Sequence, residues 1–69
     1  MSDHVYRVTE VVGSSPESVQ QAIRNGVARV SRTVRNVEWF EVTELRGHVT
    51  DGAIDAYQVG LKVGFRLED

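Results

Sequence analysis

Apolar and polar residues alternate along the last part of the chain, which predicts a β-strand over residues 53–67. The alternation is strict in the second half of this segment. One face carries Tyr57, Val59, Leu61, Val63, Phe65 and Leu67, and the other carries Gln58, Gly60, Lys62, Gly64 and Arg66. We expect the first face to lie in the core.

Two further segments have the composition of strands. Residues 4–12 are rich in Val, Tyr and Thr and stop at Gly13, where we expect a turn. Residues 37–47 form the other strand. Between this strand and the last one lie Asp51 and Gly52, which predict a two-residue hairpin turn because both positions tolerate positive φ.

A helix is predicted between the first two strands. It is expected to begin in residues 14–17, where a hydroxyl cap, a proline and a carboxylate follow one another. Small or apolar residues then recur at steps of three and four, at Val19, Ala22, Ile23, Gly26, Val27, Val30 and Val34. The sequence therefore predicts an α+β fold, a single β-α-β-β domain over residues 1–69 in which a three-stranded antiparallel sheet wraps one helix.

The hairpin turn also predicts which residues of the last two strands pair. Counting back from Asp51 and Gly52 without a bulge sets Phe40 beside Val63. We expect this apolar side, which includes Val42, to receive the helix.

The only tryptophan of the chain is predicted to stand on the opposite side of the sheet. The same count pairs Trp39 with Gly64 and Thr43 with Gly60, and it leaves a flat groove beside the indole. An uncovered indole of about 200 Å² would forgo several kcal/mol of burial at about 25 cal/mol per Å². Either another subunit packed on Trp39 or a planar ligand satisfies this requirement, and the glycines fit both because they allow a close approach.

Length and composition limit the possible functions. A chain of 69 residues without cysteine has neither disulfides nor thiolate metal sites to support a small core, so we expect a homo-oligomer. A net charge of -2 argues against nucleic acid as a partner. The sequence shows neither a secretion signal nor a membrane-length apolar run, and we expect a cytoplasmic protein that does not enter membranes.

No group of residues in the sequence predicts catalysis. His4 and His48 lie far apart with no third ligand near either, so no metal site is expected. Glu41 is predicted to face Lys62 across the hairpin, but opposite charges on neighbouring strands are commonly structural. We therefore expect a protein that is not an enzyme.

The sequence resembles the bacterial dodecins over nearly its whole length. The segments that carry the resemblance are WFEVTELRG at 39–47 and YQVGLKVGFRL at 57–67, together with the opening HVYRVTEVVG, the SSPES segment and the QAIRNG segment. This resemblance implies a hollow shell of twelve subunits that holds flavins as stacked pairs near two-fold axes, with a tryptophan closing each end of the stack.

The resemblance also implies which residues bind the flavin. Trp39 occupies the place of the stacking tryptophan, Gln58 that of a glutamine at the polar edge of the ring, and Arg46 that of an arginine near the flavin, with Arg66 as a further candidate. Gln58 is predicted to pair near Leu45, about 20 Å along the strand from Trp39. We therefore expect each flavin to take these two side chains from different subunits.

The resemblance leaves the ligand and its use open. FMN, FAD and riboflavin share the ring that would stack, and storage, sequestration and protection from light all fit a quenched flavin. Some dodecins also bind coenzyme A, for which Arg29 and Arg32 on one helix face are candidates. The alternatives are a coenzyme A-binding shell and an oligomeric assembly module without a cofactor.

Overall fold

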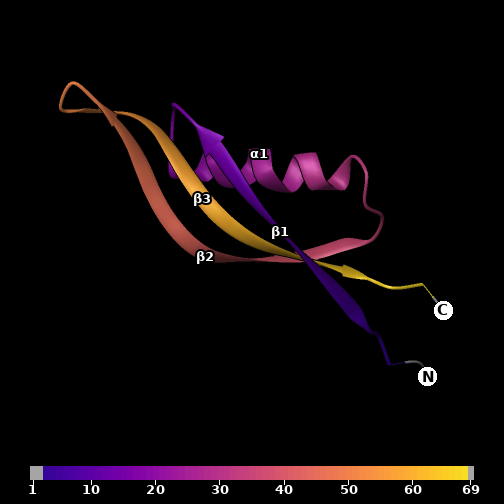
Figure 1. The fold of residues 1–69 in the computed structure, drawn as a ribbon. Coiled ribbons are helices and arrows are strands. Elements are labelled where there is room, and N and C mark those ends of the chain that lie inside the picture. The colour runs from indigo at the N-terminus through magenta and orange to yellow at the C-terminus, as the bar shows by residue number, and fades with distance from the viewer. Residues whose placement is uncertain (1–2, 69) are drawn as a thin grey trace.

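The computed structural model describes residues 3–68 as one helix and three strands. Strand β1 spans Tyr6–Ser15, helix α1 spans Val19–Ser31, strand β2 spans Val37–Thr50 and strand β3 spans Ala53–Arg66. The predicted β-α-β-β order is confirmed. The start of β1 and the end of β3 lie at one end of the molecule, and the β2–β3 hairpin extends past the helix to the other end (Figure 1).

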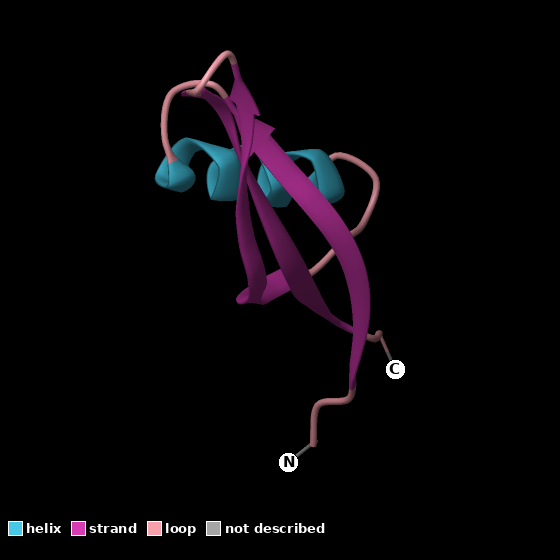
Figure 2. Ribbon diagram, turned by 60° about the vertical axis from the view of Figure 1, so that its left-hand side comes forward, coloured by secondary structure: helices cyan, strands magenta, loops and turns pink. Residues whose placement is uncertain are grey.

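The sheet is antiparallel throughout, with strand order β1-β3-β2. The helix lies across one face of the curved strands and packs mainly on β1 and β3 (Figure 2). The buried core consists of Ala22, Val30, Val59, Leu61 and Val63, so the predicted helix stripe and the central part of the predicted alternation in β3 are confirmed. The prediction was wrong for Leu67, which follows the end of β3 and is exposed. No helix among the described residues is long and apolar enough to cross a membrane.

The helix begins later than the sequence predicted. Its N-cap is Ser18, whose hydroxyl accepts a hydrogen bond of 3.0 Å from the backbone N–H of Gln21. Strand β1 continues through Gly13 to Ser15, and the buried hydroxyl of Ser15 accepts a hydrogen bond from the backbone N–H of Glu17. Residues 14–17 therefore end the strand and turn the chain, and the helix starts only after them.

Gly13 does not lie at a turn. The absence of its side chain instead allows the helix to pack closely against strand β1. A Cβ atom on Gly13 would collide with the backbone carbonyl of Ala22, and one on Gly26 would meet the Cδ1 atom of Leu61 at 2.7 Å. Strand β1 and the helix thus approach closely at a pair of glycines. A glycine needed for close approach looks the same in sequence as one needed for a turn.

The hairpin turn is confirmed, and bulges alter the pairing beyond it. Asp51 and Gly52 have φ values of 52° and 78°, as a type I′ turn requires. The pairing shifts between His48 and Val49, between Val42 and Glu44, and between Val37 and Trp39.

The predicted pairs near the far end of the hairpin are correct, and those in its middle are displaced. Trp39 pairs with Gly64 and Phe40 with Val63, as expected. Gly60, however, pairs with Glu44 and not with Thr43, which is the extra residue of a bulge.

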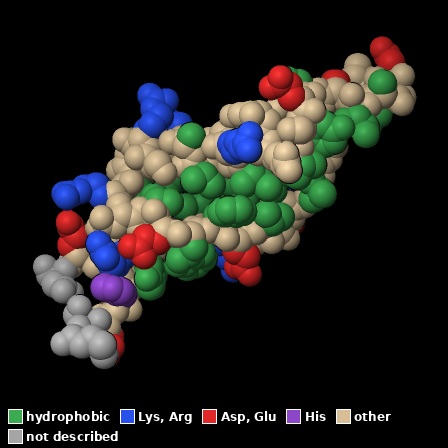
Figure 3. All heavy atoms as spheres, turned by 180° about the vertical axis from the view of Figure 1, so that it is seen from behind, with side chains coloured by type: hydrophobic (Ala, Val, Ile, Leu, Met, Phe, Trp, Pro, Cys, Tyr) green, Lys and Arg blue, Asp and Glu red, His purple; other side chains and the backbone are tan. Residues whose placement is uncertain are grey.

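The helix does not cover β2, which corrects the prediction made for Phe40 and Val42. Both residues pair with core positions of β3, but their side chains remain 49% and 46% exposed because the helix sits over β1 and β3. The large apolar side chains that the single chain leaves exposed are Val5, Tyr6, Val8, Val12, Trp39, Phe40, Val42, Leu45, Val49, Ile54 and Leu67. Seen from behind, apolar side chains form a continuous band along the long axis, with charged groups around it (Figure 3).

Candidate functional site

The indole of Trp39 lies flat over Gly64 on the face of the sheet opposite the helix. A Cβ atom on Gly64 would fall among the atoms of the indole, so the ring occupies the space that a side chain would otherwise take. The predicted groove beside the tryptophan is therefore filled by the tryptophan itself. Trp39 is still 39% exposed, and its outer surface is open to a further flat group.

Tyr6 packs against the edge of this indole from strand β1. The two rings have centroids 6.3 Å apart at an interplanar angle of 61°, and His4 continues the row with a centroid distance of 6.5 Å to Tyr6. Edge-to-face contacts of this kind are favourable because the positive edge of one ring meets the negative face of the other. Tyr6 reaches this position because it pairs with Arg66, two residues beyond Gly64 on β3.

A hydrogen-bonded network adjoins the two aromatic rings. The Tyr6 hydroxyl donates a hydrogen bond of 3.1 Å to the Oε1 atom of Glu38, and the Nη1 atom of Arg66 lies 3.5 Å from the Oε2 atom of the same carboxylate. The bond to Glu38 raises the pKa of Tyr6, because the carboxylate accepts a proton that ionisation would remove. Glu38 is the unpaired residue of the bulge between Val37 and Trp39, a place where side chains are often redirected.

A second polar group lies on the same face toward the hairpin end. Arg46 pairs with Gln58, and its guanidinium donates to the Gln58 Oε1 atom at 3.5 Å and to the Glu44 Oε1 atom at 2.5 Å. The bulge at Thr43 makes this arrangement possible, because the extra residue brings Glu44 and Arg46 onto the side that Gln58 occupies. The predicted neighbour of Gln58, Leu45, pairs with Val59 instead.

The four candidate flavin residues thus fall into two groups within one chain. Trp39 and Arg66 gather around Gly64, whereas Arg46 and Gln58 lie six residues away along β3, or about 20 Å at strand spacing. The expectation that one flavin takes residues of both groups from two subunits stays a prediction.

The two helix arginines lie apart from all of these residues. Arg29 is exposed and lines two grooves beside β1, of about 370 and 350 Å³, one with Ser14 and Asn25 and the other with Thr9. Arg32 is the C-cap residue of the helix and lines neither groove. The role of these residues in binding coenzyme A stays a prediction.

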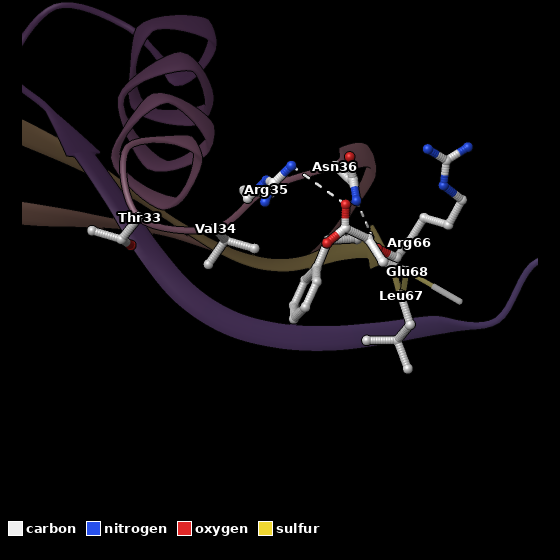
Figure 4. Close-up of a pocket in the computed structure, with 8 residues that line it drawn as sticks. Thr33, Val34, Arg35, Asn36, Arg66, Leu67 and Glu68 are labelled. Carbon is white, nitrogen blue, oxygen red and sulfur yellow. Dashed lines mark hydrogen bonds and ion pairs between the residues drawn. The ribbon is translucent and has the colours of Figure 1, made fainter.

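A further groove of about 340 Å³ lies at the opposite end of the sheet from the hairpin turn. Its wall is held by an ion pair of 3.4 Å between Arg35 and Glu68 and by Asn36, whose amide donates to the carbonyl of Arg66 (Figure 4). The guanidinium of Arg66 points away from Arg35 and Asn36 in this view, and its Nη1 atom forms the ion pair with Glu38 described above.

Near the hairpin turn, His48, Asp55 and Thr50 form a compact exposed cluster. The Nδ1 atom of His48 lies 2.7 Å from the Oδ1 atom of Asp55, and the hydroxyl of Thr50 donates to the other carboxylate oxygen. These bonds lower the pKa of Asp55, with the Thr50 bond as the largest cause. Among residues 3–68, no three His, Cys, Asp or Glu side chains come together as a metal site would require.

Sequence analysis did not identify three residues of the candidate site. Tyr6, Glu38 and Glu44 depend on the alignment of β1 with β3 and on the two bulges in β2. A stretch with two acidic side chains beside its only tryptophan, at 38–41, was the available signal for Glu38. Nothing in the local sequence signals Tyr6, because its contact with Trp39 spans the sheet.

Comparisons with known proteins all point to one family. The sequence profile of the Dodecin family matches residues 5–68. The chain is 46% identical over 65 residues to the dodecin of Thermus thermophilus, covering 94% of both proteins, and 30% identical over 63 residues to a calcium dodecin of Mycobacterium tuberculosis, covering 91% and 89%. The solved structure of a dodecin from Streptomyces davaonensis superimposes with a TM-score of 0.94 at 59% identity, over 99% of this chain and 100% of that one.

Proposed function

This chain belongs to the dodecin family, and from this premise we propose that it binds flavins without converting them, as a hollow assembly of twelve copies. The observation that carries the proposal is the single tryptophan, which lies flat over Gly64, half exposed, on the face that the helix leaves bare. A flat aromatic surface held in this way is preorganised for stacking, since the ring loses little freedom when a planar ligand covers it.

The residue types of the site suit an isoalloxazine ring. An indole offers a broad electron-rich face to an electron-poor ring. The amide of Gln58 supplies both a donor and an acceptor to a ring edge on which carbonyl and N–H groups alternate. Arg46 lies against Gln58 and aligns its amide, and Arg66 places a positive charge close to the tryptophan, where the phosphate of FMN or FAD would find a counter-ion.

A complete site is proposed to require more than one chain. The two residue groups are too far apart on one sheet to touch a single ring, and the exposed face of Trp39 needs a cover. Two subunits that meet around a two-fold axis would bring the tryptophan of one chain to the glutamine of the other, with two stacked flavins between the two indoles.

Quenching and protection are the proposed use of this arrangement. A flavin excited by light can take an electron from an adjacent indole and return it before it reacts with oxygen. The bound cofactor is thereby stored in a form that does not drive side reactions. The binding protein is expected to consume no NAD(P)H when it holds a flavin.

Fluorescence titration tests the proposal. We expect riboflavin, FMN and FAD to lose their fluorescence on binding to the wild-type protein, and Trp39→Ala to abolish both the quenching and most of the affinity. The matched control is Tyr57→Phe, which alters an aromatic residue outside the candidate flavin set and is expected to quench as the wild type does. A bright flavin in the wild-type complex, or unchanged quenching in Trp39→Ala, would contradict the proposal.

Coenzyme A is a second candidate ligand, favoured by the two grooves that Arg29 lines on the helix side of β1. Phosphates of coenzyme A would meet Arg29 and Arg32 on the outside of the assembly. We expect the double substitution of both arginines with alanine to weaken coenzyme A binding at low salt and to leave flavin binding unchanged. Equal coenzyme A affinity in the double variant would remove this candidate.

A further inference from the structure

Tyr6, Trp39 and Glu38 form a chain of groups that can carry an electron in one direction and a proton in another. The Tyr6 ring meets the indole edge at a centroid distance of 6.3 Å, with no other described residue needed to connect them. The phenol proton points at the Oε1 atom of Glu38 at 3.1 Å. This distance is within the range at which a positioned base removes a proton.

The proton acceptor matters because of the chemistry of phenols. A tyrosine gives up an electron readily only when its hydroxyl proton leaves at the same time, since the protonated phenol radical is a strong acid. The hydrogen bond to Glu38 keeps the phenol protonated in the resting protein and raises the pKa of Tyr6. The guanidinium of Arg66 lies 3.5 Å from the other oxygen of the same carboxylate.

Simple packing would not require this arrangement. A phenylalanine at position 6 would make the same edge contact with the indole, and a tyrosine at a half-exposed position could leave its hydroxyl in water. Tyr6 is 39% exposed, yet its hydroxyl is bonded to Glu38, the carboxylate at the bulge beside Trp39. The combination of ring contact, bonded hydroxyl and adjacent base is what a coupled transfer of electron and proton requires.

We propose that Tyr6 reduces oxidised Trp39 and passes its phenol proton to Glu38. The inference rests on the proposed flavin site, because the oxidant is a light-excited flavin that takes one electron from the indole. The indole radical cation then takes one electron from Tyr6 while the hydroxyl O–H bond breaks and its proton binds Glu38. The products are a neutral indole, a neutral tyrosyl radical, a protonated Glu38 and the one-electron-reduced flavin.

The cycle closes without net chemistry. The reduced flavin returns its electron to the tyrosyl radical, and Glu38 returns the proton to the phenolate oxygen. The benefit is that the stacking indole, the only tryptophan in the chain, spends little time oxidised and exposed to attack by water or oxygen. In some events the reduced flavin does not return its electron directly to Trp39. In these events Tyr6 reduces the indole and so preserves the binding surface.

Radical transfer can be followed in the assembled protein without any flavin. Azide radicals produced by pulse radiolysis oxidise tryptophan preferentially, and here every tryptophanyl signal comes from Trp39. We expect the tryptophanyl absorbance to decay as a tyrosyl absorbance rises, in a first-order step independent of protein concentration. Tyr6→Phe is expected to lose this step, and Tyr57→Phe, the matched control that removes the other described tyrosine, to retain it.

Glu38→Gln tests the proton acceptor. The amide cannot take the phenol proton, so we expect the conversion to slow on the order of 100-fold, the lower part of the range that a positioned base contributes. Equal conversion in Tyr6→Phe and the wild type, or an unchanged rate in Glu38→Gln, would overturn the inference. Circular dichroism and sedimentation confirm that each variant is folded and assembled.

A second arm separates this inference from the proposed function. With flavin bound, a light flash is expected to produce a tyrosyl signal in the wild type and in Tyr57→Phe, and a longer-lived tryptophanyl signal in Tyr6→Phe. A wild-type protein that binds no flavin would contradict the proposed function, while the flavin-free arm still decides the electron path. Normal flavin binding and quenching with no tyrosyl signal in either arm would contradict the inference alone.

Discussion

Gly64 determines where the indole of Trp39 lies. A side chain at this position would occupy the same space as the indole, so the ring can lie on the strand only because glycine leaves the surface bare. Gly60 has a similar part, since its missing side chain makes room for the Thr43 hydroxyl, 3.0 Å from where a Cβ would lie. At both positions the space above the glycine is used by the neighbouring strand of the same chain.

Gly64→Ala is predicted to displace the indole and weaken flavin binding by about fivefold or more, since overpacking costs about 1–3 kcal/mol. The measurement is the same fluorescence titration with riboflavin. Gly47→Ala is the matched control, because a Cβ atom there would lie 3.5 Å from the nearest atom, at ordinary contact distance. Flavin binding by Gly64→Ala as tight as that of Gly47→Ala would show that the position of the ring does not matter.

At the residue scale, the sequence was sufficient to predict the position of Trp39 and insufficient to predict which residues surround it. A hairpin turn of known length fixes the pairing of Trp39 with Gly64, and alternation fixes the face on which both lie. Tyr6 and Glu38 could not be found in this way. The first depends on a pairing between strands that are distant in sequence, and the second on a bulge that no local pattern marks.

At the scale of elements, the β2–β3 hairpin contains two bulges that compensate for each other. Asp55 is the extra residue on β3, and Thr43 is the extra residue on β2. Between the two bulges every pair is displaced by one residue, and beyond Thr43 the displacement disappears. This explains why a count without bulges predicts the partner of Trp39 correctly and the partner of Gln58 wrongly.

The cluster around Asp55 fixes the first of these bulges. Thr50 and His48 both bond to its carboxylate, and they come from the strand opposite. Because the pKa of Asp55 is lowered, the folded protein favours the ionised form more than the unfolded chain does. The stabilisation is therefore present at pH values above the ordinary pKa of aspartate and is lost as the pH falls through the lowered value.

Asp55→Asn is predicted to destabilise the protein at neutral pH, and its difference from the wild type is predicted to shrink once the pH falls below the ordinary pKa of aspartate, about 4, and through the lowered value. Urea denaturation at pH 7 and at pH 3, at one fixed protein concentration, measures the difference between the two proteins. Asp3→Asn removes an equal charge from an exposed position near the start of the chain and is the control. A difference between Asp55→Asn and the wild type that was as large at pH 3 as at pH 7 would show that the ionised carboxylate is not its cause.

The single chain is elongated and buries few of its residues. Its radius of gyration is 14.3 Å, whereas a compact chain of this size would have about 11 Å. Its extents are 55 × 20 × 14 Å. Five apolar residues are buried, and a long band of apolar side chains remains uncovered (Figure 3). The expectation from composition that the chain needs partners has its physical basis in this shape.

Phe40→Glu is predicted to prevent assembly. Phe40 lies on the helix side of β2 but beyond the reach of the helix, so we expect another subunit to cover it. A carboxylate there would have to be buried without a partner at that contact. Sedimentation velocity is expected to show a small species for Phe40→Glu and the full assembly for Gln20→Glu, which introduces the same charge at an exposed helix position. Full assembly of both variants would place Phe40 outside the interface.

The single unpaired residue at Thr43 has a consequence for how such a sheet can change over generations. Loss of Thr43 itself would leave every pair in place, because Val42 and Glu44 already lie opposite consecutive residues of β3. Loss of Leu45 would close the same bulge in another way, with Thr43 moving opposite Gly60 and Glu44 moving opposite Val59, on the helix side of the sheet. One codon deleted in this stretch can therefore carry a carboxylate from one face of the sheet to the other while Arg46 and Gln58 stay opposite each other.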